Sequence, residues 1–139
     1  MSVFGKDYAT YYDMLYQNKD YGVEADYVAD LLKDAGVTSG ELLDVGCGTG
    51  KHLLCMKNKG FSVSGVDMSE NMIEKARSLL GSGADLQVAR SDSFSFKKKF
   101  NAVTSLFHVM SYLTKTDDVM TTFNNVSEHL NYTGGGIII

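Results

Sequence analysis

A short apolar run followed by three regularly spaced glycines is the feature that most constrains the fold of this chain. Residues 42–45 are apolar apart from Asp44, and Gly46, Cys47, Gly48, Thr49 and Gly50 come directly after them. Glycine at every second position lets the backbone turn tightly and come within contact distance of a ligand, because no Cβ intervenes. A helical pattern follows over residues 51–59. The segment therefore predicts a strand, a turn close to a ligand, and a helix.

Helical and strand patterns alternate along the rest of the chain. Apolar spacing predicts helices over residues 24–35, 51–59, 69–80 and 117–130, and strands over 41–45, 61–66, 84–89, 101–107 and 136–139. Such alternation favours parallel pairing through right-handed crossovers. We therefore expect an α/β fold with a Rossmann-like, doubly wound, mostly parallel sheet, in which ligands bind beyond the carboxyl ends of the strands.

Local signals also predict helix ends, and apolar spacing marks one face of several helices. Ser69 is expected to cap the third helix, and Gly36 to end the first. Apolar residues recur at helical spacing in the first helix (Tyr27, Val28, Leu31, Leu32 and Ala35) and in the last (Val119, Met120, Phe123, Val126 and Leu130). In the third helix, the residues expected on the inner face are Met72, Ile73, Ala76, Leu79 and Leu80.

Composition limits the classes of partner. The chain has 139 residues, 44% hydrophobic, with a net charge of −4, so one domain is expected, with a helical lid segment over 1–36 and a Rossmann-like core over 37–139. The chain has no basic stripe that would favour binding to nucleic acid. Its only dense basic run, residues 97–99, is typical of a solvated turn. No apolar stretch approaches the roughly 20 residues that span a bilayer. Cys47 and Cys55 form neither a disulfide framework nor a metal pattern, which favours a reduced, cytoplasmic setting.

The glycine spacing separates two kinds of cofactor. Dinucleotide binders use G-x-G-x-x-G, in which the turn approaches a pyrophosphate. Here the third glycine comes one residue earlier, which suits a ligand without phosphates and argues against a nicotinamide-dependent oxidoreductase. Asp44 could organise the turn or contact a cationic amino group. The simpler interpretation is a tight turn in any α/β protein.

Acidic residues follow the next two predicted strands. Asp67 lies 17 residues beyond Gly50, so it should emerge beside the glycine turn, where a carboxylate can accept hydrogen bonds from both ribose hydroxyls. Asp92, flanked by Ser93, could accept a hydrogen bond from the exocyclic amino group of a purine. A plain turn cap explains Asp92 about equally well.

His108 and Tyr112 follow the fourth predicted strand and are the candidate catalytic groups. For His108, a structural role in the core or at its rim is the favoured alternative. The first 21 residues are rich in tyrosine, including Tyr12 and Tyr21. Such a cluster could close over a ligand as a lid, or it could simply anchor a helix.

Three segments resemble class I S-adenosylmethionine (SAM)-dependent methyltransferases: LLDVGCGTG at 42–50, VSGVDMSENMIEKAR at 63–77, and the stretch 100–113. Residues 8–32 are similar to a subgroup that methylates amino sugars linked to nucleotides. The resemblance implies SAM as cofactor and a small-molecule methyl acceptor. It also implies a seven-stranded sheet, of which this chain would lack the last strands, leaving an edge that could form a homodimer. A SAM-binding module without catalysis is the alternative.

The resemblance also implies roles for individual residues. The glycines at the turn, with Cys47 between them, would line the methionine end of the cofactor, and Asp67 would hold the ribose. Met68 would pack on the adenine, with Asp92 and Ser93 at its edge. Leu106 would lie under the methionine moiety, and Tyr12 and Tyr21 would close over the cofactor. A general base is optional for an amine acceptor, and Tyr112 or His108 would serve if one is used.

Overall fold

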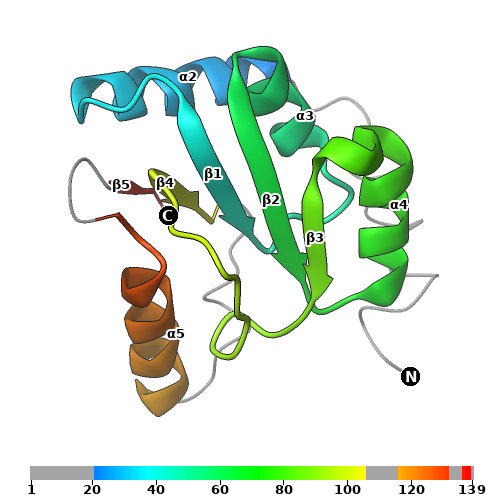
Figure 1. Ribbon diagram of the computed structural model, residues 1–139, viewed down its shortest axis with the longest axis vertical. Helices are drawn as coiled ribbons and strands as arrows, with labels where there is room; N and C mark the ends of the chain where they lie inside the picture. Colours follow the sequence, from blue (N-terminus) through cyan, green and yellow to red (C-terminus); the bar gives the residue numbers. More distant parts are fainter. Residues whose placement is uncertain (1–20, 106–115, 132–135, 139) are drawn as a thin grey trace.

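A five-stranded parallel sheet forms the centre of the computed structural model, which describes residues 21–105, 116–131 and 136–138 (Figure 1). Its strands are β1 (Gly40–Val45), β2 (Phe61–Asp67), β3 (Asp85–Val88), β4 (Ala102–Thr104) and β5 (Gly136–Ile138). They lie in the order β3-β2-β1-β4-β5, and each neighbouring pair is parallel. The predicted Rossmann-like sheet is confirmed. Its winding reverses between β1 and β4, the place where such sheets bind ligands.

Helices cover both faces of the sheet. They are α2 (Tyr21–Asp34), α3 (Lys51–Asn58), α4 (Glu70–Leu80) and α5 (Thr116–Glu128). One buried apolar cluster joins α2, α3 and α4 to the side of β1 that carries Leu42. A second cluster joins Val126 of α5 and three phenylalanines of the β3–β4 connection to the side that carries Leu43. Because successive strand residues point to opposite faces, the two clusters lie on opposite sides of the sheet.

Helix α2 is the described part of the predicted N-terminal lid, and it belongs to the core. Ala25, Val28 and Leu32 are buried in the same cluster as the sheet residues. Gly36 ends the helix as expected, with φ +87° and its N–H bonded to the carbonyl of Lys33 at 2.9 Å. Residues 1–20 of the predicted lid lie outside the described part of the chain.

The predicted elements all occur, with ends shifted by up to three residues. The Ser69 cap of α4 is confirmed, because its Oγ accepts a hydrogen bond from the N–H of Met72 at 3.2 Å. Within the described residues, helix α2 extends back to Tyr21, three residues before the predicted start at Glu24. Strand β4 ends at Thr104, although the pattern extended it to residue 107.

The predicted inner face of the helix over 69–80 was too wide, and apolar residues at helical spacing in two other helices are also exposed. Leu79 of α4 is 41% exposed, and Met120 and Phe123 of α5 are 54% and 38% exposed. Tyr27 and Leu31 of α2 are exposed, as is Ala35 just beyond its end. A helix packed on a sheet buries only a limited stripe, so apolar residues at the margin of that stripe face solvent. Composition alone does not reveal that margin.

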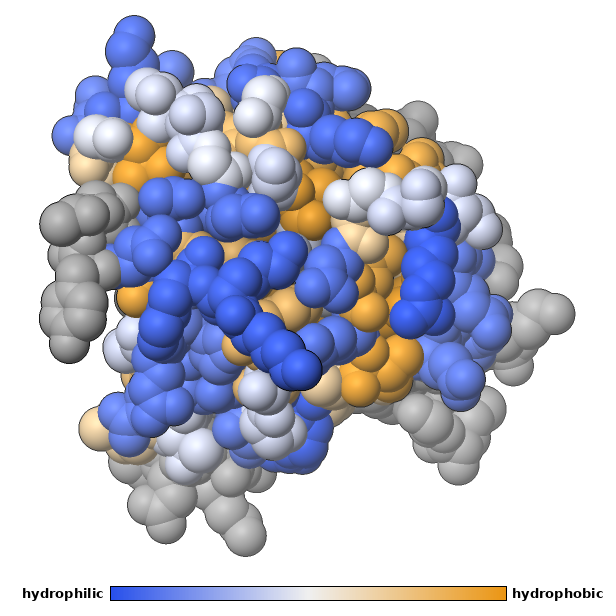
Figure 2. Space-filling model, viewed as in Figure 1, coloured by the Kyte–Doolittle hydropathy of each residue, from blue (hydrophilic) through white to orange (hydrophobic). Residues whose placement is uncertain are grey.

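Polar side chains cover most of the side of the molecule that carries the β3–β4 connection, with apolar patches between them (Figure 2). Lys97 and Lys99 are exposed, as predicted for a solvated turn. Lys98 is half-buried, and its Nζ lies 3.9 Å from Glu41 and 3.8 Å from Asp85. Within the described ranges, every helix is too short or too polar to cross a lipid bilayer.

Candidate functional site

The turn between β1 and α3 depends on glycine for its backbone geometry. Gly46, Gly48 and Gly50 have φ values of +79°, +57° and +85°, in the left-handed region that other residues rarely adopt. The N–H groups of Gly46 and Cys47 both donate to the carbonyl of Val66, at 2.7 and 2.9 Å. The turn is therefore bound to the carboxyl end of β2.

Asp67 ends β2 and its carboxylate lies against the glycine turn. Oδ2 accepts a hydrogen bond from the N–H of Gly48 at 2.9 Å, and Oδ1 accepts one from the N–H of Ser69 at 2.9 Å. Burial raises the pKa of this carboxyl above its usual range, while the two N–H donors lower it. Each carboxylate oxygen has two acceptor positions, so both oxygens can still accept a further donor.

Asp44 lies at the base of the same turn and is 2% exposed. Its Oδ1 accepts a hydrogen bond from the hydroxyl of Thr104 at 2.9 Å, across the β1–β4 pair in which the two residues are register partners. Burial raises the pKa of Asp44 to about 7; the Thr104 bond opposes the rise and the charge of Asp67 adds to it. Sequence reasoning missed Thr104, because only the strand order brings it beside β1.

The side-chain positions at Gly50 and Cys47 face the protein interior. A Cβ on Gly50 would lie 3.1 Å from Leu80 and 3.2 Å from Ala76, so this glycine allows α3 to approach α4. Cys47 is buried, and a Cβ on Gly65 of β2 would lie 2.8 Å from its sulfur. Burial raises the pKa of the Cys47 thiol well above its usual range. Gly50 and Cys47 can therefore contact a ligand only through their backbone atoms.

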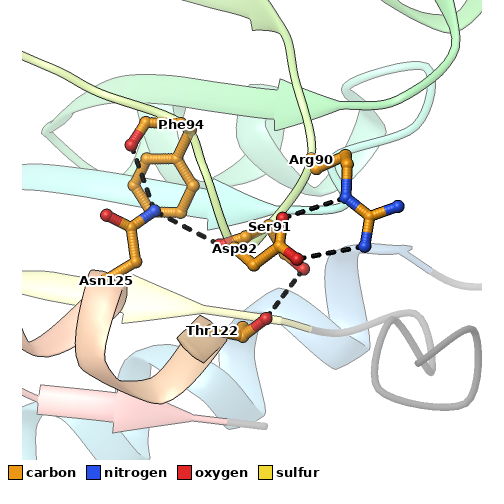
Figure 3. A network of polar contacts seen from close by, with 6 residues as sticks. All are labelled: Arg90, Ser91, Asp92, Phe94, Thr122 and Asn125. Atoms are coloured by element: carbon orange, nitrogen blue, oxygen red, sulfur yellow. Dashed lines mark hydrogen bonds and ion pairs between the residues drawn. The ribbon is translucent and has the colours of Figure 1, made fainter. Parts of the chain in front are cut away.

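The candidate adenine-binding residues lie at the ends of β2 and β3. These ends are adjacent, since Asp67 pairs with Val88 and its carbonyl accepts the N–H of Ala89 at 3.0 Å. Met68, just beyond β2, is 38% exposed. Asp92 follows β3, and its two oxygens accept 3.0 Å bonds from the guanidinium of Arg90 (Figure 3), which lower the pKa of this carboxyl.

Tyr21 is the only described member of the predicted tyrosine cluster. Its ring lies 4.8 Å from the ring of His52 in a T-shaped arrangement, and the Nζ of Lys51 lies 5.4 Å from its centroid. Tyr21 is thus placed beside the first turn of α3, directly after the glycine turn. Four other predicted site residues, Tyr12, Leu106, His108 and Tyr112, lie outside the described residues.

Taken together, the described site is a glycine turn flanked by two carboxylates at the reversal point of the sheet. Carboxylates favour a ligand that carries hydroxyl donors or positive charge. They disfavour phosphate, particularly because the N–H of Gly48 already donates to Asp67. No group of three or more His, Cys, Asp or Glu side chains is placed to hold a metal ion in the described parts of the chain.

A family model described as a methyltransferase domain matches residues 42–134, which include the glycine turn, Asp67 and Asp92. The chain belongs to this methyltransferase family. The resemblance to class I SAM-dependent methyltransferases is confirmed.

Individual relatives agree with the family and narrow the similarity to sugar N-methyltransferases. The chain is 35% identical, over 96% of its length, to a dTDP-3-amino-3,4,6-trideoxy-alpha-D-glucopyranose N,N-dimethyltransferase of Streptomyces venezuelae. The crystal structure of DesVI from the same organism superposes with a TM-score of 0.85 at 34% identity, covering 94% of this chain and 56% of that one. A SAM-bound amino pentose methyltransferase of Micromonospora echinaspora has a TM-score of 0.80 at 31% identity, covering 86% of this chain and 51% of that one. The chain spans about half the length of the curated relatives it matches, 56% for the first.

Proposed function

We propose that the protein binds SAM at the glycine turn and takes part in transferring its methyl group to the amine of a nucleotide-linked sugar. The observation that supports this most directly is the position of Asp67, whose carboxylate bonds to the N–H of Gly48. A carboxylate held there can accept hydrogen bonds from the hydroxyls of a ribose that lies along the turn.

The charges beside the turn favour SAM over a dinucleotide. SAM carries a positive sulfonium, a positive amino group, one carboxylate and no phosphate, so its net charge is positive. Asp44 and Asp67 would attract such a cation, whereas they would repel a pyrophosphate in the same place. The N–H of Gly48 is bonded to Asp67 and is not directed at an anion. The same residues therefore argue against a nicotinamide cofactor.

The acceptor is proposed from the relatives, which methylate amino sugars. When bound, SAM supplies an activated methyl group: the amine lone pair forms the new N–C bond, the C–S bond breaks with its electron pair going to sulfur, and the amine then loses a proton. Positive charge leaves the sulfur in this step. Asp44 and Asp67 therefore serve binding and alignment more than stabilisation of the transition state. His108 and Tyr112 remain the predicted candidates for a general base.

Calorimetry with SAM tests the binding proposal. We expect Asp67→Ala to weaken SAM binding by about 10- to 100-fold, because it removes hydrogen bonds between a charged acceptor and the ribose. Asp30→Ala is the matched control, since Asp30 is exposed on α2 and carries the same chemical change. Equal SAM affinity in the wild type and Asp67→Ala would contradict the proposal.

Two further measurements separate the alternatives. Fluorescence titration with NADH should show no saturable binding, whereas tight NADH binding would favour an oxidoreductase. Methyl transfer from labelled SAM to dTDP-linked amino sugars tests turnover independently of binding. SAM binding without transfer to any such acceptor would favour the module without catalysis.

A further inference from the structure

The connection after β3 forms a tight turn over residues 90–94 that carries Asp92 at its centre. The N–H groups of Ser93 and Phe94 both bond to the carbonyl of Arg90, at 3.2 and 3.1 Å. Phe94 is buried, whereas Ser93 is exposed. Most of the internal bonds of the turn involve Arg90, and the position of the turn on the molecule depends on what it packs against.

Helix α5 holds both sides of this turn, although it lies about 30 residues further along the chain. The side-chain amide of Asn125 donates to the carbonyl of Phe94 at 3.0 Å and to the carbonyl of Ser91 at 3.4 Å. The hydroxyls of Ser91 and Thr122 are 3.2 Å apart and buried. In Figure 3 these contacts bracket Asp92, with α5 on one side and Arg90 on the other.

A second contact fixes the chain just beyond the turn. The N–H of Phe96 donates to Nε2 of His129 at 3.1 Å, and Nδ1 of His129 lies 2.7 Å from the carbonyl of Asn125. This pairing requires a neutral imidazole that donates from Nδ1 and accepts at Nε2. The anchoring of the turn to α5 thus continues into the phenylalanine cluster on this face of the sheet.

The anchored turn fixes where the carboxylate of Asp92 can point. Arg90 donates to both oxygens, and the N–H of Asp92 itself and the hydroxyl of Ser93 also hydrogen-bond to this carboxylate. An adenine amino group would therefore replace one of these two uncharged donors, while the bonds to Arg90 stay in place. Met68 lies at the adjacent strand end, beyond β2. An adenine packed on Met68 would bring its edge toward the turn after β3.

We propose that Asn125 is a positioning residue for cofactor selectivity: by binding the carbonyls of Ser91 and Phe94, it orients Asp92 to accept a hydrogen bond from the exocyclic amino group of adenine. The inference rests on the proposed function, because it assumes that the SAM site extends from the glycine turn to the end of β3. Asn125 itself does not touch the cofactor.

A pair of ligands tests this role. One is S-adenosylhomocysteine, and the other is its analogue with unsubstituted purine, which lacks only the amino group. We expect the wild type to bind the first at least about tenfold more tightly, as for a hydrogen bond to a charged acceptor. Asn125→Asp, whose carboxylate repels the two carbonyls, should reduce this ratio of Kd values to about two, close to the ratio for Asp92→Ala.

The matched control is Asn124→Asp, which makes the same change at the neighbouring exposed position of α5. It should keep the wild-type ratio.

The ratio of Kd values also separates positioning from stability. Partial unfolding of Asn125→Asp would lower the apparent affinity for both ligands equally, because both bind the same folded population, so the ratio would not change. Thr122→Val is a second variant that loosens the turn without adding charge, and it should lower the ratio in the same direction.

The possible outcomes distinguish the role of Asn125 from the proposed function on which it rests. An unchanged ratio in Asn125→Asp, with a reduced ratio in Asp92→Ala, would overturn the role of Asn125. Equal binding of the two ligands by the wild type would also overturn the role of Asn125, but it would leave the proposal of SAM binding intact. A wild type that binds neither ligand would instead contradict the proposed function.

Discussion

Asp44 is a single residue whose ionisation is set by the surrounding fold. It is buried at the end of β1, and its carboxyl pKa is about 7, so protonated and ionised forms are both populated near neutral pH. The groups identified around it are Thr104, which donates to it, Asp67, which repels its charge, and the thiol of Cys47. A bound cation would favour the ionised form.

Affinity for SAM should therefore rise with pH. We expect SAM to bind several-fold more tightly at pH 8 than at pH 6, because the ionised carboxylate of Asp44 attracts the positive charge of the ligand. Calorimetry across this range measures the effect. Asp44→Asn removes this titrating group and should give a smaller rise in affinity than the wild type; a profile in Asp44→Asn as steep as in the wild type would assign the pH dependence to another group.

Thr104 should set the midpoint of that profile. Thr104→Val removes the hydroxyl that favours the ionised carboxylate, so the pKa of Asp44 should rise and the increase in SAM affinity should move to higher pH. Thr104→Ser retains a donor and serves as the control. A midpoint in Thr104→Val that matches the wild type would show that the hydroxyl does not govern the ionisation of Asp44.

At the scale of elements, the contact between α3 and α4 depends on Gly50. Gly50→Ala combines a left-handed φ of +85° with a Cβ only 3.1 Å from Leu80 and 3.2 Å from Ala76. We expect it to lower the free energy of unfolding by about 2 to 4 kcal/mol, from backbone strain and overpacking together. Urea denaturation gives the measurement.

Gly36→Ala separates the two contributions. Gly36 has a similar φ of +87°, but a Cβ there would meet nothing within 4 Å. Its alanine variant should therefore lose about 1 kcal/mol, the backbone contribution alone. If both variants lose the same free energy of unfolding, α4 can move away from the new Cβ at no energetic cost. The close approach of the two helices would then be unimportant for stability.

At the scale of the whole molecule, the buried carboxylates make stability depend on pH. Burial raises the pKa values of both Asp44 and Asp67 in the folded protein. The folded state therefore binds protons more tightly than the unfolded chain, and stability decreases as pH rises from about 4 to about 7. For Asp44 the change is at most about 4 kcal/mol.

Urea denaturation at pH 5 and pH 8 tests this prediction. The contribution of Asp44 should make the wild type less stable at pH 8, and Asp44→Asn should reduce the difference between the two pH values. A difference of the same size in Asp44→Asn would show that groups other than this carboxyl control the pH dependence of folding.

Local features of the fold and site could be predicted because they depend on residues close together in the chain. The Ser69 cap, the glycine turn and the alternation of elements follow from side-chain chemistry and spacing within a few residues. The position of Asp67 beside the turn also followed, because one helix and one strand separate it from Gly50 and parallel strands end at the same edge.

Other features depend on which distant residues become neighbours, and only the tertiary structure decided them. Thr104 reaches Asp44 across 60 residues because β4 lies beside β1, and Asn125 reaches Phe94 because α5 packs over the turn after β3. The exposure of Leu79 depends likewise on how α4 meets the sheet. Spacing in a sequence encodes the period of an element, whereas its neighbours are set by strand order and by the packing of layers that bury the most apolar surface.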